Sequence, residues 1–191
     1  MKKISTIIKV VLSLFLAAAI LFALIFFLAF GGGEYFLPNP PKPEITYGEF
    51  PFKLTYELDG ETKVIEDTLI CEFDGFRIVG EAGTYRQWKS YLKSGSEEIT
   101  LLDLRPLEEI NEFGQTMLEL FFYWGNAEYY MGDNFDGRWK DAQDFNWVDY
   151  KYQDVDGSIG GSAYKAEVAW EKYKIKLISW EVSDPIVNSF K

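Results

Sequence analysis

The hydrophobic positions near the start of this chain form one unbroken run. It extends from Val10 to Phe30, and Ser13 is its only polar side chain. At about 1.5 Å of rise per residue, a helix of that length crosses roughly 30 Å, the thickness of the hydrocarbon core of a bilayer. We therefore predict a transmembrane helix over residues 10–30.

Beyond residue 47 the apolar positions alternate with polar ones, which is the period of a half-buried strand. The clearest alternation runs through Phe50, Phe52, Leu54, Tyr56 and Leu58. Asp59-Gly60 follows as a strong hairpin turn, and residues 63–73 return as a second strand. Asp74-Gly75 predicts another hairpin turn, leading into a strand over 76–79. The pattern therefore predicts a meander of antiparallel strands.

The patterns in the middle of the chain are weaker. Residues 85–92 and 99–104 are predicted to be paired strands joined by the turn Ser94-Gly95-Ser96. We expect a helical turn over 107–113, a strand over 116–124, and a turn at Gly125-Asn126 into a strand over 127–131. Residues 132–161 are rich in Gly, Asp and Asn, so we predict a long loop region with a short strand at 148–152.

The C-terminal pattern changes to helical spacing. Ala163, Ala166, Trp170 and Tyr173 predict a helix with Ser162 as its N-cap, and residues 175–182 predict a last strand. The expected fold class is mainly β (α+β), with an N-terminal transmembrane helix followed by an antiparallel β meander or sandwich with one C-terminal helix.

The charges around the apolar run predict its orientation. Lys2, Lys3 and Lys9 precede the run and no acidic residue does, so the positive-inside rule places residues 1–9 in the cytoplasm. Residues 31–46, rich in Gly and Pro, are expected to form an extended stalk or a disordered spacer. Residues 47–191 would then be an extracytoplasmic β-rich domain. The alternative is a cleaved secretory signal ending near Gly31, although the run exceeds the usual 7–15-residue apolar region of such signals.

Composition narrows the partners. The chain has 30 acidic and 19 basic residues, and its formal net charge is −11. Such a surface repels nucleic acid, so no nucleic-acid partner is expected, whereas the single span makes the membrane an expected partner. The one cysteine, Cys71, can form no intrachain disulfide. It lies in an alternating apolar stretch, which predicts a small buried side chain.

Catalytic patterns are scarce. The chain has no histidine, which excludes Ser-His-Asp and Cys-His catalysis and the usual histidine zinc sites. Ser90 with Lys93, and Ser162 with Lys165, have the Ser-x-x-Lys spacing without its companion motifs. The acidic segments 133–137 and 154–157 lack the first ligand of a helix-loop-helix calcium site and predict Asx turns, with an irregular calcium site as the open alternative. We therefore predict no catalytic residue, metal ligand or cofactor.

Four residues are candidate ligand contacts. Trp139 and Trp147 have side chains that can stack on sugar rings, with burial in the core as the alternative. Arg77 and Arg86, with nearby lysines, could hold an anionic group or simply form a solvated strand face. The many acids also leave open a glycosidase that uses two carboxylates.

Two segments carry a resemblance to a known family. Residues 48–54 (GEFPFKL) and 64–75 (VIEDTLICEFDG) resemble an uncharacterised family of small single-pass, membrane-anchored proteins of Gram-positive bacteria. The resemblance implies a location and a single-domain layout, and it transfers no activity and no site residue.

Together these features predict a membrane-anchored, extracytoplasmic binding or interaction module of the bacterial envelope, with an envelope protein or a cell-wall glycan as its partner. The alternatives are a carboxylate-based hydrolase of envelope glycans, and an accessory or sensor subunit of a membrane complex.

Overall fold

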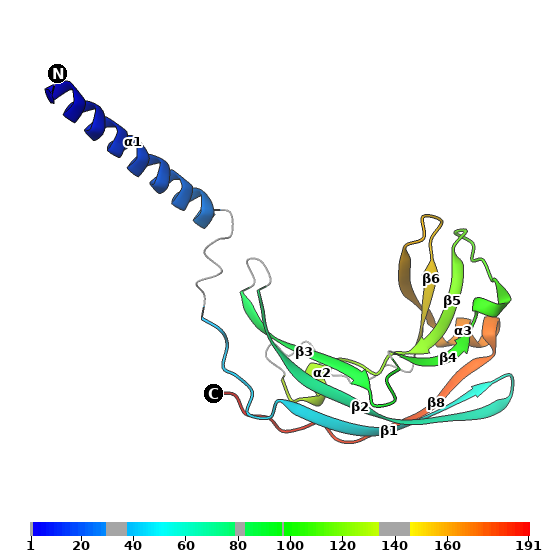
Figure 1. Ribbon diagram of the computed structural model, residues 1–191. Coiled ribbons are helices and arrows are strands. Elements are labelled where there is room, and N and C mark those ends of the chain that lie inside the picture. Colours follow the sequence, from blue (N-terminus) through cyan, green and yellow to red (C-terminus); the bar gives the residue numbers. More distant parts are fainter. Residues whose placement is uncertain (1, 30–37, 79–82, 97, 134–145) are drawn as a thin grey trace. The chain divides into compact units, whose positions relative to one another are not determined.

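The structure is a computed structural model that describes residues 2–29, 38–78, 83–96, 98–133 and 146–191. Within these residues it confirms the mainly β class (Figure 1). The helices are α1 (Lys2–Ala29), α2 (Ala127–Tyr130) and α3 (Ala166–Tyr173). The strands are β1 (Tyr47–Leu58), β2 (Glu61–Ile78), β3 (Thr84–Leu92), β4 (Ile99–Asp103), β5 (Thr116–Phe122), β6 (Trp147–Gln153), β7 (Ile159–Lys165) and β8 (Ile175–Val182).

The chain divides into two units. One comprises Met1–Lys42 with Gly75–Gln87, and the other, which we call the β domain, comprises Pro43–Asp74 with Trp88–Lys191. The first unit contains α1, whose stretch Lys9–Phe27 is long and apolar enough to span a membrane, and none of that stretch is buried. Residues 30–37, which include the three glycines of the predicted stalk, lie outside the described residues.

The first sheet has the strand order β3-β2-β1-β8. β1 and β2 pair antiparallel from Tyr47 opposite Glu72 to Leu58 opposite Glu61, so the turn at Asp59-Gly60 is confirmed. The second predicted turn is wrong, because β2 continues through Asp74-Gly75 to Ile78. Gly75 has the positive φ (92°) that this dipeptide favours, yet the chain stays extended on both sides of it.

The second sheet has the order β4-β5-β6-β7 and corrects several local predictions. β4 pairs with β5, and β3 lies in the other sheet, so residues 85–92 and 99–104 do not form a hairpin. Residues 127–131 are not a strand, because α2 forms there. The helical turn lies at Arg105–Leu107, before the expected 107–113.

The C-terminal prediction was right in type and wrong at its start. Residues 159–165 form β7, so Ser162 lies within a strand and is not the N-cap of α3, a position that Lys165 occupies. The short strand predicted at 148–152 is confirmed as β6, and the last strand is confirmed as β8.

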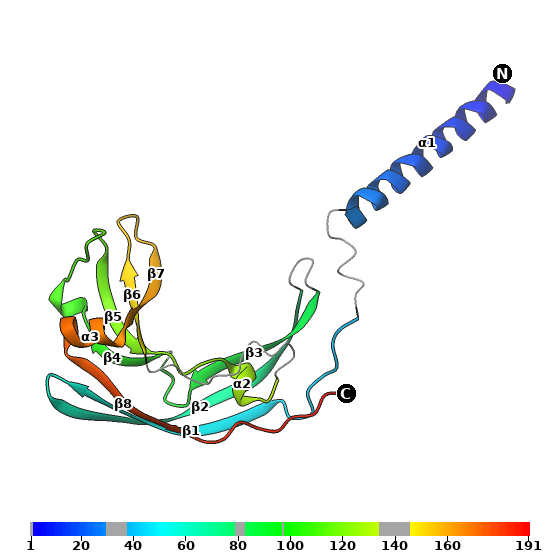
Figure 2. The ribbon, with the colours of Figure 1, turned by 180° about the vertical axis from the view of Figure 1, so that it is seen from behind.

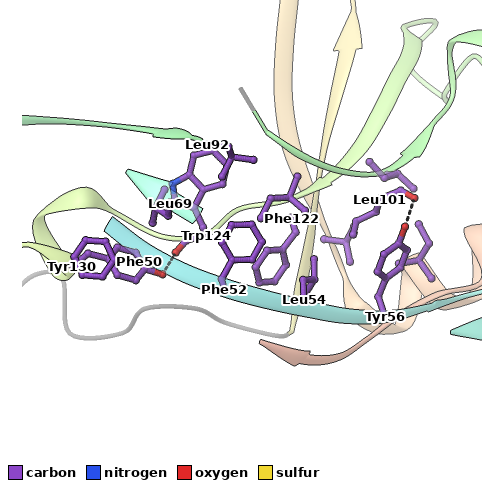
Figure 3. Close-up of a cluster of buried hydrophobic side chains, with 14 of the residues drawn as sticks. Phe50, Phe52, Leu54, Tyr56, Leu69, Leu92, Leu101, Phe122, Trp124 and Tyr130 are labelled. Atoms are coloured by element: carbon purple, nitrogen blue, oxygen red, sulfur yellow. Dashed lines mark hydrogen bonds between the residues drawn. The ribbon is translucent and has the colours of Figure 1, made fainter. Parts of the chain in front are cut away.

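The core of the β domain is made of side chains from both sheets (Figure 3). Phe50, Phe52, Leu54 and Tyr56 on β1 are all buried, as their alternation predicted. The hydroxyl of Tyr56 donates to the carbonyl oxygen of Leu101, 3.2 Å away on β4, and so links the two sheets. Cys71 is fully buried, as expected.

The two ends of the β domain are tied together. The backbone N–H of Glu44 donates to the carbonyl of Ser189 over 2.9 Å, and Pro43 and Phe190 form an antiparallel bridge. The side-chain amide of Asn188 binds both backbone groups of Ile45, at 3.0 and 2.8 Å, and also donates to the carbonyl of Met131 at 3.1 Å.

Candidate functional site

The candidate site lies on the face of the second sheet that points away from the core, which we call the outer face. Along β6, Val148 is buried, so its neighbours Trp147 and Asp149 point to the opposite side of the sheet, as does Lys151. Register places Phe121 and Ala163 on either side of Asp149, and Glu119 and Gly161 on either side of Lys151. Figure 2 shows β6 and β7 side by side in this sheet.

Lys151 is the centre of a charged cluster on the outer face. Its ammonium nitrogen lies 2.7 Å from Oε1 of Glu98 and 3.6 Å from Oε1 of Glu119. It also lies 5.6 Å from the ring centroid of Phe121, within the range of a cation–π contact. Partial burial opposes the charge of Lys151, but the hydrogen bond to Glu98 and the two carboxylate charges outweigh it and raise the pKa of Lys151. Lys151 therefore stays protonated at neutral pH.

The carboxylates of the cluster differ in their surroundings. Glu119 accepts a hydrogen bond of 3.0 Å from the hydroxyl of Thr100. Oε2 of Glu98 is buried and has no hydrogen-bond partner among the residues that the structure describes. Burial, strengthened by the charge of Glu98, raises the pKa of Asp149, while a backbone hydrogen bond partly offsets this. The cluster thus combines an ammonium donor, carboxylate acceptors and an aspartic acid, Asp149, whose pKa is raised.

Trp147 adds an aromatic surface to this face. It is 41 % exposed, so the prediction that it is available to a ligand is compatible with the structure, and it is not a core residue. Its cross-strand neighbour is Lys165, and the row next to it carries only the small side chain of Ala163 on β7. The outer face therefore offers an indole ring beside hydrogen-bonding groups, an arrangement suited to a hydroxyl-rich ligand. Trp139, the other tryptophan candidate, lies outside the described residues.

The two arginine candidates lie in the other sheet, on neighbouring strands. Arg77 is exposed near the end of β2, and Arg86 lies on β3, where its guanidinium donates to the carbonyl of Pro41 at 3.1 Å. The lysines predicted to join them are occupied, because Lys89 lies 2.9 Å from Glu72 and Lys93 lies 2.8 Å from Glu49. The structure therefore does not bring Arg77 and Arg86 together with Trp147 in one sheet.

The acidic segments considered for calcium have structural roles where they are described. Asp133 is buried and accepts a 2.7 Å hydrogen bond from the indole nitrogen of Trp88. Oδ1 of Asp156 accepts from the backbone N–H of Ser158 at 2.9 Å, which is the predicted Asx turn. Within the described ranges, no group of three or more His, Cys, Asp or Glu side chains could hold a metal ion.

Sequence reasoning missed most of the cluster. The sequence predicted a short strand over residues 148–152, but nothing local showed that Glu98 and Glu119 would meet Lys151. That meeting depends on the pairing of β5 with β6 and on the path of the chain into β4.

Comparison with known protein families, with curated proteins and with solved structures gave no match. The resemblance to membrane-anchored proteins of Gram-positive bacteria therefore stays a prediction.

Proposed function

We propose that this protein is a membrane-anchored interaction module, with α1 in the membrane and the β domain exposed on the extracytoplasmic side of a bacterial envelope. The observation that carries the proposal is that no part of the long apolar stretch Lys9–Phe27 is buried. Leaving so much apolar surface in water is costly, at roughly 25 cal/mol for each Å². A lipid bilayer removes that cost, and the lysines before the apolar stretch favour a cytoplasmic N-terminus.

The β domain supports a binding role more than a catalytic one. Its core is filled by interlocking aromatic and aliphatic side chains, and its functional groups lie on the outer face of the second sheet. There Trp147 and the Lys151 cluster present stacking and hydrogen-bonding surfaces of the kind that recognise a glycan or a protein.

Membrane topology can be tested with engineered cysteines, because the native Cys71 is buried. Burial raises the pKa of the Cys71 thiol to about 12, with a further rise from the charge of Glu128, so it should be silent. We expect a membrane-impermeant maleimide to label Val187→Cys in intact cells, since Val187 is highly exposed, and to label Lys3→Cys only after lysis. Labelling in the reverse order would overturn the proposed topology.

One observation favours a hydrolase as a second candidate function. Asp149 has a raised pKa and lies close to the carboxylate of Glu98, as a general acid beside a second carboxylate would. A hydrolase of this kind would release reducing ends from purified cell-wall glycan. Asp149→Asn should abolish the release, whereas Asp103→Asn on β4 should not; no release by the wild-type protein would exclude this alternative.

In the third interpretation the protein is an accessory or sensor subunit, and its transmembrane helix makes the specific contact with the partner. Replacing residues 10–30 with an unrelated apolar sequence distinguishes such a subunit from the interaction module. The module should retain its partner after this exchange, because its contacts lie in the β domain, whereas an accessory subunit should lose it.

A further inference from the structure

One end of the second sheet exposes an unusual number of large apolar side chains. They come from the connection between β4 and β5 and from the β6–β7 hairpin, and we call them the apolar tip: Leu107 (65 % exposed), Ile110 (65 %), Phe113 (75 %), Val155 (87 %) and Ile159 (68 %). Among the other described large apolar residues of the β domain, only Val187 exceeds 51 % exposure. Large exposed apolar side chains that gather at one end of a domain are typical of interaction sites.

The register of the sheet brings the two connections together. Ile110 bridges to Thr116, Thr116 pairs with Gln153, and Gln153 pairs with Ile159, so the two isoleucines lie in one row across the sheet. The side-chain amide of Gln115 also lies 3.5 Å from Oδ2 of Asp154. In Figures 1 and 2 the two connections end next to each other.

Hydrogen bonds hold the tip in shape. Oδ1 of Asn111 accepts from the backbone N–H groups of Phe113 and Gln115, both at 3.0 Å, and Met117 donates its N–H to the carbonyl of Glu109 at 2.8 Å. In the hairpin, Gly157 donates to the carbonyl of Asp154 at 2.9 Å. A preformed surface loses little conformational entropy when it binds a partner.

The charge around the tip is strongly negative. Segments 103–115 and 153–159 carry six carboxylates against one guanidinium, a formal net charge of −5. Arg105 is already paired with Asp103 at 2.7 Å, and Glu109 is paired with Lys172 at 2.8 Å. Glu108 and Glu112 have no ion-pair partner in the described part of the chain, so their charges are available to a binding partner.

This charge selects the occupant. An anionic lipid surface would be repelled by the carboxylates beside the apolar side chains, and so would the tip of a second copy. A protein segment that combines apolar residues with Lys or Arg would gain both burial and charge complementarity.

We propose that the apolar tip is a docking site for a cationic, partly apolar segment of another envelope protein. The proposal rests on the function proposed above and specifies its partner class. The apolar side chains supply buried area, and Glu108 and Glu112 at the margin steer the partner and fix its orientation.

Photocrosslinking in intact cells of the native host tests the proposal in the full-length protein. The photoreactive residue p-benzoylphenylalanine replaces Phe113, and in a matched control it replaces Val187, which is even more exposed but lies outside the tip. We expect a discrete adduct at position 113 with a different protein, and none at position 187. Mass spectrometry of the adduct should identify a peptide that carries apolar residues together with Lys or Arg.

Two further variants test the chemistry of the tip. Combining Glu108→Gln with Glu112→Gln, or Val155→Ser with Ile159→Ser, should lower the adduct yield at position 113 several-fold while protein abundance stays unchanged. An adduct with lipid, an adduct with a second copy, equal yields at positions 113 and 187, or no adduct would each overturn the proposal.

The outcome also separates this proposal from the proposed function. If position 113 gives no adduct while the same photoreactive residue at Trp147 crosslinks to an envelope component, the interaction module stands and the tip is not its docking site. If the cysteine labelling shows a cytoplasmic β domain, the proposed function itself fails.

Discussion

At the scale of single residues, a buried hydroxyl group satisfies a backbone carbonyl in the core of the β domain. Tyr130 has no exposed surface, and its hydroxyl donates to the carbonyl oxygen of Trp124 over 2.6 Å (Figure 3). Tyr123→Phe is a matched control, because the hydroxyl of Tyr123 lies in a more exposed side chain and donates to the amide oxygen of Asn126. The two substitutions remove the same atom from different environments.

We expect Tyr130→Phe to lower the free energy of unfolding by about 1–3 kcal/mol, because the buried Trp124 carbonyl loses this donor without gaining water. Tyr123→Phe should change it by less than about 0.5 kcal/mol. Urea unfolding followed by tryptophan fluorescence measures both values. Equal losses in the two variants would contradict the interpretation.

Cys71 makes stability depend on alkaline pH. Its thiol is fully buried, and burial, with a smaller effect from the charge of Glu128, raises its pKa to about 12, against a usual value of about 8.5 in an unfolded chain. Between these values the unfolded chain binds fewer protons than the folded one, so stability must fall as pH rises, by up to about 1.4 kcal/mol per pH unit.

Urea midpoints measured from pH 8 to pH 11 test this dependence. Cys71→Ala should lose some stability at every pH because it removes a buried atom, but its stability should decline less steeply above about pH 8.5. A smaller decline should remain, since burial also raises the pKa of Tyr130. Parallel curves for wild type and variant would show that Cys71 does not carry the effect.

At the scale of elements, the β6–β7 hairpin depends on one glycine. A Cβ atom on Gly160 would lie 2.4 Å from the ring carbon that bears the hydroxyl of Tyr152, its direct partner on β6, so the ring needs the space that glycine leaves. Gly161 is different, because the nearest atom to its Cβ would be the carbonyl oxygen of Tyr150 at 3.4 Å.

We therefore expect Gly160→Ala to destabilise the β domain by about 1–3 kcal/mol through overpacking. Gly161→Ala should be near neutral, since alanine restricts the unfolded chain more than glycine does. Thermal unfolding compares the two, and Tyr152→Ala should make Gly160→Ala tolerable in the double variant. If the stability loss persisted in the double variant, a clash with the Tyr152 ring would not be its cause.

The elements also show how far the sequence could predict the fold. β1 and β2 followed from alternation and from Asp59-Gly60, because both signals are local. Asp74-Gly75 carries the same turn signal, but β2 lies between β1 and β3 and pairs with both. This pairing keeps the chain extended through the dipeptide, despite its preference for a turn. The strand predicted over residues 127–131 was wrong because α2 is only one turn long. So short a helix shows no helical period in the sequence.

The candidate site was predictable only in part. Trp147 was identified from its residue type, and its exposure follows from the alternation of β6. Glu98 and the apolar tip could not be recognised, because they depend on which strands pair and at which ends the connections meet. The sequence does not distinguish the exposed Phe113 from the buried Phe122. The difference arises because Phe122 lies on the core side of β5, whereas Phe113 lies in the connection before that strand.

At the scale of the whole molecule, the question is whether the β domain needs the apolar helix in order to stay folded. None of the Lys9–Phe27 stretch is buried, whereas the β domain ties its own two ends together through Asn188 and Ile45. All six tryptophans follow residue 43, so tryptophan fluorescence reports on the β domain alone.

We therefore expect the β domain to keep its melting temperature when the helix is removed. A protease recognition sequence inserted between Gly32 and Gly33 allows the full chain to be folded in detergent and then cut. The midpoint should move by less than about 2 °C, because none of the described stretch Lys9–Phe27 is buried. Asn188→Ala provides the positive control: it removes three hydrogen bonds at the join between the two ends, so it should lower the midpoint by several degrees, cut or uncut. A large drop on cutting the wild-type chain would mean that the helix is part of the folded domain, and the anchor-and-module architecture would have to be abandoned.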